Sequence, residues 1–291
     1  MRAVSSALVV FLGLFIGNDA GAAPAVERDL AYGSDAKQRL DLSVPAVKGC
    51  PTVLFIHGGS LTTGDKADED YGKVCAPFPD AGIACANVNY RLAPGAAWPA
   101  QAEDVAAAVA WVRTNIRTRG GDPHKLFLLG HSSGARLVAL VGTDERYLAR
   151  QGLKTSDLRG MIPMGSITWD DELEQALPQY GRGRVEEAFR RDPANQIYAN
   201  LDTYLDSWPI HHVRAGLPPF LFLIAEAETE HPPVLKTNKK FVEDASALGN
   251  RAEYRVLPGR THYSAIRKLA EPGDAVFAIV RNFVQQLGGV Q

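Results

Sequence analysis

The sequence lacks the signatures of several protein classes. It holds only three cysteines, and it contains no C-x-x-C pair and no H-E-x-x-H segment, so it offers no recognisable metal-binding pattern. Its 31 basic and 33 acidic residues are interspersed and nearly cancel, to a net charge of −2. Such a balance creates no field of one sign that would attract nucleic acid or an anionic membrane. These absences favour a protein whose partner is a small molecule.

Length and composition fit one large globular domain. The chain has 291 residues, of which 46% are hydrophobic and 22% are charged, close to the average of globular proteins. A chain of this size buries about three quarters of the surface that its unfolded form exposes. It therefore needs neither a metal nor a disulfide framework to build a core. The oligomeric state has no signal in the sequence.

The N-terminus differs from the rest of the chain. Arg2 precedes an apolar run at residues 7–16, and the small residues Ala-Gly-Ala follow at 20–22. Charge, apolar run and small-residue cleavage site occur in the order of a secretory signal peptide. The run is about half the ~20 residues that span a bilayer, and no later stretch approaches that length. We expect residues 1–22 to be removed and residues 23–291 to be secreted or periplasmic; an uncleaved anchor is the alternative.

The three cysteines leave their pairing open. Cys50, Cys75 and Cys85 all lie after the predicted signal peptide, and an odd number leaves at least one unpaired within the chain. Export would allow a Cys75–Cys85 or a Cys50–Cys85 disulfide. Three buried thiols that act as small hydrophobic residues are the other interpretation.

Short β-branched runs alternate with longer amphipathic stretches, which predicts a parallel sheet covered by helices. The predicted strands are 26–32, 38–44, 52–56, 83–89, 126–129, 158–164, 220–225 and 252–257. The predicted helices are 67–80, 100–117, 134–147, 234–248 and 275–286. Residues 165–217 break the alternation with aromatic, charged, Gly and Pro residues, and we expect them to form a small helical cap beside the carboxyl ends of the strands. A segment that merely covers the sheet edge is the alternative.

A candidate nucleophile lies between a predicted strand and a predicted helix. Residues 130–134 read Gly-His-Ser-Ser-Gly, a G-x-S-x-G pattern that in this context puts the central serine on a sharp turn with an exposed Oγ. The pattern selects Ser132, because only Ser132 lies midway between the two glycines. The N-terminus of the following helix favours negative charge that develops beside it.

A glycine-rich turn that could stabilise an oxyanion follows the predicted strand 52–56. It reads His57-Gly58-Gly59-Ser60, and turns of this kind supply backbone N–H donors together with the residue after the nucleophile. The predicted donors are the N–H groups of Gly59, Ser60 and Ser133. We interpret His57 as a residue that braces the loop, because it precedes the nucleophile, whereas hydrolases with this serine motif follow the order serine, acid, histidine.

The predicted catalytic base is His262. Residues 257–264 read Leu-Pro-Gly-Arg-Thr-His-Tyr-Ser, a loop that begins where the last predicted core strand ends. A histidine there can reach the carboxyl edge of the sheet. The histidines that lie in the predicted cap or at a Pro-rich turn are interpreted as surface or pocket residues: His211, His212 and His231.

The acid that would orient this base is less sharply defined. It should follow the predicted strand 220–225, where the chain reads Glu226-Ala227-Glu228-Thr229-Glu230 and contains no aspartate. A glutamate can hold an imidazole as an aspartate does. We favour Glu228, and Glu230 and Glu226 remain alternatives.

Five motifs occur in the same order along the chain as in a known protein family. They are His57-Gly58-Gly59, Asn89-Tyr90-Arg91-Leu92-Ala93-Pro94, Pro99-Ala100-Gln101-Ala102-Glu103-Asp104-Val105, Gly130-His131-Ser132-Ser133-Gly134-Ala135 and Arg260-Thr261-His262-Tyr263-Ser264. Over about residues 37–287 the chain resembles the carboxylesterases and lipases of the hormone-sensitive-lipase and feruloyl-esterase-like group, with arylformamidases as close relatives. The resemblance implies the α/β-hydrolase fold, a mostly parallel central sheet of about eight strands with helices on both faces and a small helical cap.

The resemblance also implies a Ser132–Glu228–His262 triad and the oxyanion donors named above. The chain departs from the family at three places. Glu228 stands where an aspartate is expected, Ser60 stands where many members have a third glycine or an aromatic residue, and Arg136 stands where many have histidine. Tyr90, Arg91 and Asp104 recur in the family, and we interpret them as structural hydrogen-bonding residues.

Together these features predict a cofactor-independent serine hydrolase that cleaves carboxylic esters of short to medium acyl chain. An arylformamidase-type amidase or a peptidase is an enzymatic alternative, and a noncatalytic binding protein of the same fold is an alternative from another class. Turnover of a short acyl ester separates these classes. The acyl group and the alcohol are not indicated, because the pocket wall is expected to come from residues 165–217.

Overall fold

The structure, a computed structural model, describes residues 25–167, 171–192 and 195–289. The predicted signal peptide, residues 1–22, lies outside the described residues. Within the described ranges, no helix combines the length and the apolar character that crossing a membrane requires.

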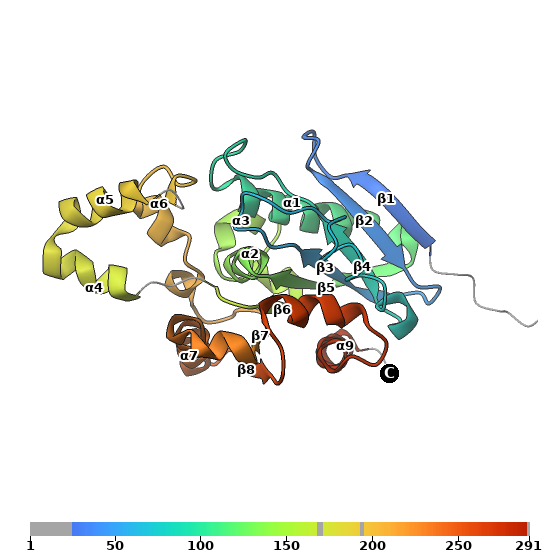
Figure 1. The fold of residues 1–291 in the computed structure, drawn as a ribbon. Helices are drawn as coiled ribbons and strands as arrows, with labels where there is room; N and C mark the ends of the chain where they lie inside the picture. The colour runs from blue at the N-terminus through green and yellow to red at the C-terminus, as the bar shows by residue number, and fades with distance from the viewer. Residues whose placement is uncertain (1–24, 168–170, 193–194, 290–291) are drawn as a thin grey trace, which may run out of the picture.

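The core is one mixed sheet in the order β1-β2-β4-β3-β5-β6-β7-β8 (Figure 1). Its strands are β1 Ala25–Ala31, β2 Arg39–Val44, β3 Cys50–Ile56, β4 Ala84–Val88, β5 Gly121–His131, β6 Leu158–Met164, β7 Phe220–Ala225 and β8 Ala252–Leu257. β2 pairs antiparallel with β1 and with β4, and every other pairing is parallel. The predicted strands and the predicted fold class are confirmed.

Helices cover both faces of the sheet. They include α1 Ala100–Asn115, α2 Ser133–Thr143, α3 Glu145–Ala149, α7 Pro232–Ala247, α8 His262–Arg267 and α9 Ala275–Gly288. Alternate residues of β3 enter different clusters. Leu54 and Ile56 belong to the core cluster that residues of α1, α2 and α7 also form, whereas Val53 and Phe55 belong to the cluster that includes residues of α8 and α9. β3 is buried along its whole length because helices cover both of its faces, which explains why its residues are apolar apart from Thr52.

The predicted helix at 67–80 is wrong. The segment forms successive turns and ends in a short 3₁₀ helix, η1 Pro79–Ala81. Pro77 and Pro79 cannot donate the backbone hydrogen bonds of a continuous helix. The side-chain amide of Asn87, a residue of β4, donates to the carbonyl oxygens of Lys66 (2.9 Å) and Tyr71 (3.0 Å) and so ties the start of the segment to the sheet.

The structure also settles the pairing of the cysteines and corrects the predicted helix 134–147. Cys75 and Cys85 form a disulfide that ties the irregular segment to β4, with Cα atoms 5.4 Å apart, and Cys50 is a buried free thiol. The predicted helix 134–147 divides into α2 and α3, because Asp144 is extended and its carboxylate caps α3 by accepting from the N–H of Arg146.

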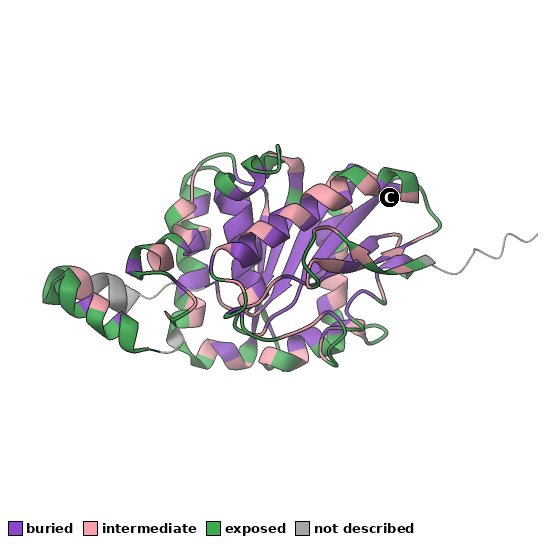
Figure 2. Cartoon of the chain, turned by 90° about the horizontal axis from the view of Figure 1, so that it is seen from above, coloured by how far each residue is buried: buried purple, intermediate pink, exposed green. Residues whose placement is uncertain are grey.

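The segment between β6 and β7 is helical, as predicted. It contains α4 Asp171–Tyr180, α5 Arg182–Arg191, α6 Leu201–Asp206 and the 3₁₀ helix η5 Pro209–His212. Figure 1 shows α4 and α5 beside the sheet, on the side away from β1. α5 buries only Val185 and Phe189, and Figure 2 shows these outer helices largely exposed. The segment therefore contacts the core mainly through its last third, where η5 meets α2.

Candidate active site

Ser132 occupies a sharp turn with an unfavourable backbone conformation at the carboxyl edge of the sheet. β5 ends at His131 and α2 begins at Ser133, so one residue joins strand to helix. Its backbone has φ 56° and ψ −124°, a conformation that is unfavourable for residues other than glycine. The Ser132 N–H donates to the carbonyl oxygen of Met164 (2.9 Å) and fixes the turn against β6.

Three glycines make room for this turn. A Cβ on Gly130 would lie 2.2 Å from the carbonyl oxygen of Gly134, and one on Gly134 would lie 2.2 Å from that of Ile56. A Cβ on Gly58 would lie 2.8 Å from the Cβ of Ser132. At Gly130 and Gly134 the obstructing atoms belong to the backbone, which cannot move aside as a flexible side chain can. The close approach therefore requires glycine at both ends of the pentapeptide, and Gly58 leaves room for the Cβ of Ser132 itself.

A buried carboxylate holds the imidazole of His262. Glu228 Oε1 lies 2.7 Å from His262 Nδ1, and Glu228 Oε2 accepts from the N–H of Ala225 (2.9 Å). Burial opposes the charge of Glu228, but these hydrogen bonds outweigh it and lower the pKa of the carboxyl group. An ionised carboxylate only accepts hydrogen bonds, so Nδ1 carries the proton and Nε2 is left as an acceptor.

Only one of the three candidate glutamates lies at His262. All three occur in the 3₁₀ helix η6 Glu226–Glu230, which directly follows β7. Glu228 is 8% exposed, whereas Glu226 and Glu230 are exposed at the surface. Glu226 accepts from the N–H of Gly259 (2.7 Å) and so braces the loop that carries His262. The structure thus brings Glu228 to the imidazole and leaves its neighbours outside.

The glycine-rich turn presents backbone N–H groups near Ser132. Gly59 has φ 113°, and a Cβ there would lie 2.1 Å from the carbonyl oxygen of Thr63. Ser60 also has a positive φ, of 53°. In the described part of the chain, neither the Gly59 N–H nor the Ser60 N–H donates to a protein acceptor. Ser133 is the first residue of α2, where an N–H has no partner within the helix.

His57 lies under the turn and away from the reacting atoms. It is fully buried, its Nδ1 lies 2.7 Å from the carbonyl oxygen of Gly58, and its ring stacks on Tyr90 at 4.4 Å. Burial lowers the pKa of His57, so the ring is neutral. The Tyr90 hydroxyl donates to the His57 carbonyl oxygen (3.0 Å). The bracing position predicted for His57 is confirmed.

Arg91 and Asp104 form a structural pair. The Arg91 guanidinium donates to both carboxylate oxygens of the fully buried Asp104 at 2.6 to 3.1 Å, and the Arg91 N–H donates to the same group. Gln38 adds a further hydrogen bond to Asp104 (2.7 Å). These contacts tie the loop after β4 to α1, as the sequence interpretation expected.

His131 was not identified from the sequence as a contributor to the site. Its Nε2 lies 2.9 Å from the carbonyl oxygen of His262, and its Nδ1 lies 3.2 Å from the hydroxyl of Tyr71. A carbonyl only accepts, so Nε2 carries the proton and Nδ1 receives the Tyr71 hydroxyl. Burial, aided by the nearby His262, lowers the pKa of His131 to about 4. The ring is a neutral support for the His262 loop.

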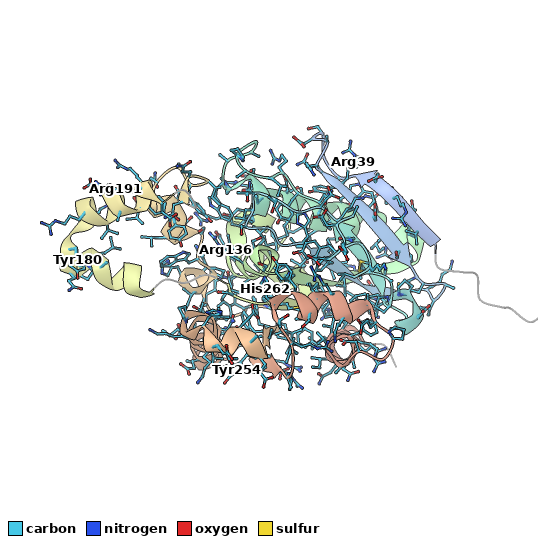
Figure 3. All side chains as sticks on the ribbon, in the orientation of Figure 1. Arg39, Arg136, Tyr180, Arg191, Tyr254 and His262 are labelled. Atoms are coloured by element: carbon cyan, nitrogen blue, oxygen red, sulfur yellow. A yellow bond between two sulfur atoms is a disulfide. The ribbon has the colours of Figure 1, made fainter. Side chains whose placement is uncertain are left out.

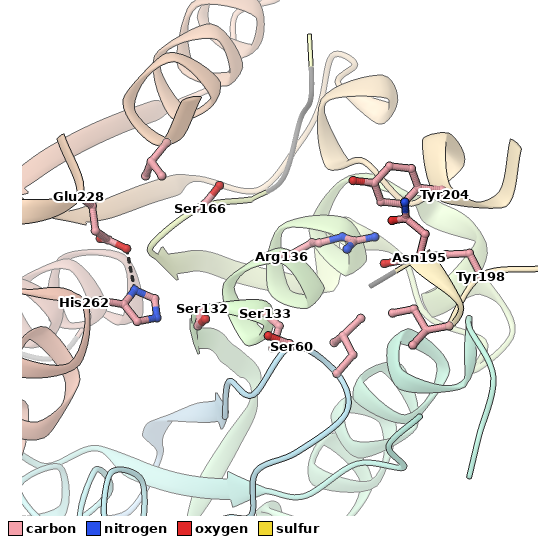
Figure 4. A pocket seen from close by; sticks show the side chains of 13 residues that line it. Ser60, Ser132, Ser133, Arg136, Ser166, Asn195, Tyr198, Tyr204, Glu228 and His262 are labelled. Carbon is pink, nitrogen blue, oxygen red and sulfur yellow. Dashed lines mark hydrogen bonds and ion pairs between the residues drawn. The ribbon is translucent and has the colours of Figure 1, made fainter. Parts of the chain in front are cut away.

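A cavity of about 410 Å³ opens at this edge of the sheet. Figure 4 shows its reactive end, where the imidazole of His262 lies between the carboxylate of Glu228 and the side chain of Ser132. Of the six residues predicted to form the triad and the oxyanion hole, five line it: Ser60, Ser132, Ser133, Glu228 and His262. Gly59, the sixth, is not among the lining residues. His211, His212 and His231 do not line the cavity.

The far end of the cavity is built by residues without a catalytic motif: Arg136, Asn195, Ile197, Tyr198 and Tyr204. Figure 3 places Arg136 and His262 near the centre of the molecule, whereas Tyr180 and Arg191 lie on the outer helices. Most of this wall comes from residues 165–217, and the aromatic residues of that segment are the only sign in the sequence that it contributes to a pocket. Within the described residues, no group of three or more His, Cys, Asp or Glu side chains is arranged to hold a metal ion.

The fold and part of the sequence match known proteins. Residues 40–162 match the BD-FAE family model. The chain is 30% identical over 263 residues to esterase LipC of Mycobacterium tuberculosis, covering 87% of this chain and 63% of LipC. It is 30% identical over 251 residues to the probable carboxylic ester hydrolase LipM of the same organism, covering 82% of this chain and 56% of LipM. The chain thus spans less than two thirds of either relative.

The fold also matches solved structures whose sequences are only distantly similar to this chain. A truncated carbohydrate esterase from gut microbiota superposes with a TM-score of 0.69 at 18% identity, covering 94% of this chain and 98% of that one. At such low identity the match concerns the fold. The predicted resemblance is confirmed: the chain has the α/β-hydrolase fold and is similar, over most of its length, to proteins named as esterases.

Proposed function

We propose that this protein is a carboxylic-ester hydrolase that works through an acyl-enzyme. One observation carries the proposal: Ser132, held on a sharp turn, lines the same cavity as His262, whose Nδ1 is bound by the buried Glu228 carboxylate. A serine, an imidazole and a carboxylate in this arrangement can activate a hydroxyl group for attack on an acyl carbonyl. The names of the relatives support the same activity.

In the first half of the reaction, Ser132 Oγ attacks the ester carbonyl and His262 Nε2 takes its proton. The N–H groups of Gly59, Ser60 and Ser133 stabilise the oxyanion. The negative charge of Glu228 stabilises the imidazolium that forms, and the lowered pKa keeps this carboxyl group ionised at neutral pH. The imidazolium then returns the proton to the leaving alcohol as the carbon–oxygen bond breaks.

In the second half, water replaces the alcohol. His262 Nε2 removes a proton from the water, and the hydroxide attacks the acyl carbon. The Ser132 ester bond breaks, and the proton passes to Ser132 Oγ. The products are a carboxylic acid, an alcohol and the free enzyme. No step of this sequence requires a cofactor.

The proposed acyl group is short to medium. The cavity of about 410 Å³ lies near the lower end of the roughly 300–1,000 Å³ that small-molecule sites span. Its far wall includes the bulky side chains of Tyr198 and Tyr204, which favours acyl groups that fit within the cavity.

Hydrolysis of 4-nitrophenyl esters from acetate to palmitate tests the activity and the chain preference together. We expect turnover to be fastest on acetate to hexanoate. A fluorophosphonate probe should add to a single residue, Ser132, which peptide mass spectrometry identifies. Absence of hydrolysis on every ester, or labelling at another residue, would contradict the proposal.

We also propose that the protein is exported after removal of residues 1–22. The charge pattern of that segment supports export, as does the Cys75–Cys85 disulfide, because such bonds persist in oxidising compartments. Expression of the full sequence in a bacterial host should yield a periplasmic or secreted protein whose N-terminus lies near residue 23. A cytoplasmic protein that retains Met1 would contradict this proposal.

A further inference from the structure

Arg136 is a buried cation at the far end of the cavity. It is the fourth residue of α2, one helical turn after Ser132, and only 7% of its surface is exposed. Buried guanidinium groups ordinarily pair with a carboxylate, because an unpaired charge in the interior is costly. Among the residues that the structure describes, no carboxylate forms an ion pair with Arg136.

Other contacts fix the position of the guanidinium. Nε donates to the carbonyl oxygen of Ser207 (3.4 Å), and Nη2 donates to its hydroxyl. Three aromatic rings surround the group, with centroids 5.3 Å (Trp98), 5.3 Å (Tyr198) and 5.9 Å (Tyr204) from its central carbon. Such rings attract a cation and confine it. The guanidinium is therefore held in place without being neutralised.

Part of its hydrogen-bonding capacity is unused. A guanidinium carries five N–H donors, and the two bonds to Ser207 engage only Nε and Nη2. Nη1 donates to no acceptor among the described residues, and it is not sealed from the cavity, which Arg136 lines. Figure 4 shows the guanidinium directed toward Asn195 and Tyr204, away from His262. Free donors and positive charge thus face the space that a substrate would occupy.

We propose that Arg136 binds a carboxylate carried by the ester substrate, an inference that rests on the proposed esterase function. A carboxylate matches the planar donor geometry of a guanidinium and supplies the missing countercharge. Arg136 lies about 6 Å along the helix axis from Ser132, and its side chain extends further away. The carboxylate therefore lies several bonds from the scissile carbonyl, as it does in a half-ester of a dicarboxylic acid.

Paired substrates test this proposal on the wild-type protein. Monoethyl glutarate and monoethyl adipate carry the carboxylate on the acyl side, with ethyl pentanoate and ethyl hexanoate as neutral partners. The butyrate ester of 4-hydroxybutanoate carries it on the alcohol side, with butyl butyrate as partner. Hydrolysis is followed by proton release. We expect at least one charged ester to have a kcat/KM about tenfold or more above its partner, the size of effect that a charge-assisted hydrogen bond gives.

The variant Arg136→Met should lower that charged-to-neutral ratio by about tenfold or more, because it keeps a side chain of similar length without the charge. Arg150→Met removes an exposed arginine that directly follows α3 and is paired with Glu103, and it should keep the wild-type ratio. Melting temperatures of both variants separate a loss of substrate preference from a loss of folding.

The outcomes distinguish the two proposals. If the wild type cleaves neutral esters but shows no preference in any pair, or if Arg136→Met keeps the preference, the carboxylate proposal is overturned and the esterase proposal stands. If no ester is cleaved, the esterase proposal fails. Calorimetric titration with glutarate then decides the role of Arg136: binding by the wild type and loss of binding in Arg136→Met would support it, and absence of binding by the wild type would overturn it.

Discussion

The two ends of the cavity are built by different parts of the fold. At the reactive end, Ser132, Glu228 and His262 directly follow core strands or the turns after them, and Gly130 and Gly134 are packed against backbone atoms. At the far end, Asn195, Tyr198 and Tyr204 come from the segment between β6 and β7, whose helix α5 buries only two side chains. One end is fixed by the sheet, and the other is supported by a lightly packed segment.

We expect the reactive end of the cavity to determine the reaction and the far end to determine which substrates are accepted. Backbone contacts at Gly130 and Gly134 leave little room for a change in the geometry of the turn at Ser132. Side chains at the far end can change without disturbing the sheet, because loops tolerate substitution better than core strands. We therefore expect substitutions at the reactive end to abolish turnover and substitutions at the far end to redirect it. The predictions below test this division.

The largest effect is expected for Ser132→Ala. Without Oγ no acyl-enzyme forms, and because triad members act as a unit, turnover of 4-nitrophenyl butyrate should fall by roughly 10⁴-fold or more. Ser246→Ala, an exposed serine on α7, is the matched control and should keep wild-type turnover. Activity of Ser132→Ala within tenfold of wild type would rule out Ser132 as the nucleophile.

The next largest effect is expected for Glu228→Gln. The variant keeps the size of the side chain but removes the charge that stabilises the imidazolium, so kcat should fall by about 10²- to 10⁴-fold with little change in KM. Glu226→Gln and Glu230→Gln are controls from the same short helix, and both should cost much less because their side chains are exposed. If Glu230→Gln shows the large loss instead, Glu230 is the acid. Kinetics should be compared at matched thermal stability.

A smaller effect, and a change of preference rather than a loss, is expected at the far end. Ile197 lines the cavity there, so Ile197→Ala should enlarge the space and raise kcat/KM for octanoate relative to butyrate esters by about tenfold, the scale of one or two methylene groups in an apolar pocket. Ile279→Ala, on α9 and outside the cavity, should leave that ratio unchanged.

Faster hydrolysis of emulsified long-chain triglyceride than of tributyrin by the wild type would contradict the short-chain assignment.

The same division explains how far the sequence could be interpreted. Strands β3, β6 and β7 are apolar runs between turn signals, and Ser132 lies in a five-residue motif, so local patterns sufficed for them. Residues 67–80 misled the helix prediction because their backbone forms successive turns, and the side chain of Asn87, a residue on another element, holds the start of the segment through the carbonyl oxygens of Lys66 and Tyr71. The surroundings of Arg136 come from Trp98, Tyr198 and Ser207. Contacts between such distant residues depend on the fold, and no local pattern in the sequence reports them.

The smallest predicted effect concerns stability and involves His131, the neutral support of the reactive end. Its ring is buried between Tyr71 and the His262 backbone, and its pKa is lowered to about 4. In the unfolded chain a histidine binds its proton near pH 6.5. Between about pH 6.5 and pH 4 the unfolded state therefore binds more protons than the folded state. The free energy of unfolding must fall as the pH is lowered through this window, by at most about 1.4 kcal/mol per pH unit for one proton.

Urea denaturation of wild type and of His131→Gln at pH 7.5, 6.5, 5.5 and 4.5 measures this contribution. The variant should be less stable at pH 7.5, because it loses two hydrogen bonds, yet its free energy of unfolding should decline less steeply as the pH is lowered.

A residual decline is expected from His57, whose pKa is also lowered by burial. Glu228 adds a loss only near and below the ordinary glutamate pKa of about 4.3, where the unfolded chain binds a proton while the lowered pKa keeps the folded carboxyl group ionised. His231→Gln, at an exposed position, should retain the wild-type slope. If His131→Gln and wild type lose stability in parallel from pH 6.5 to 4.5, His131 is protonated in the folded protein, and the His262 loop is then supported by a charged ring.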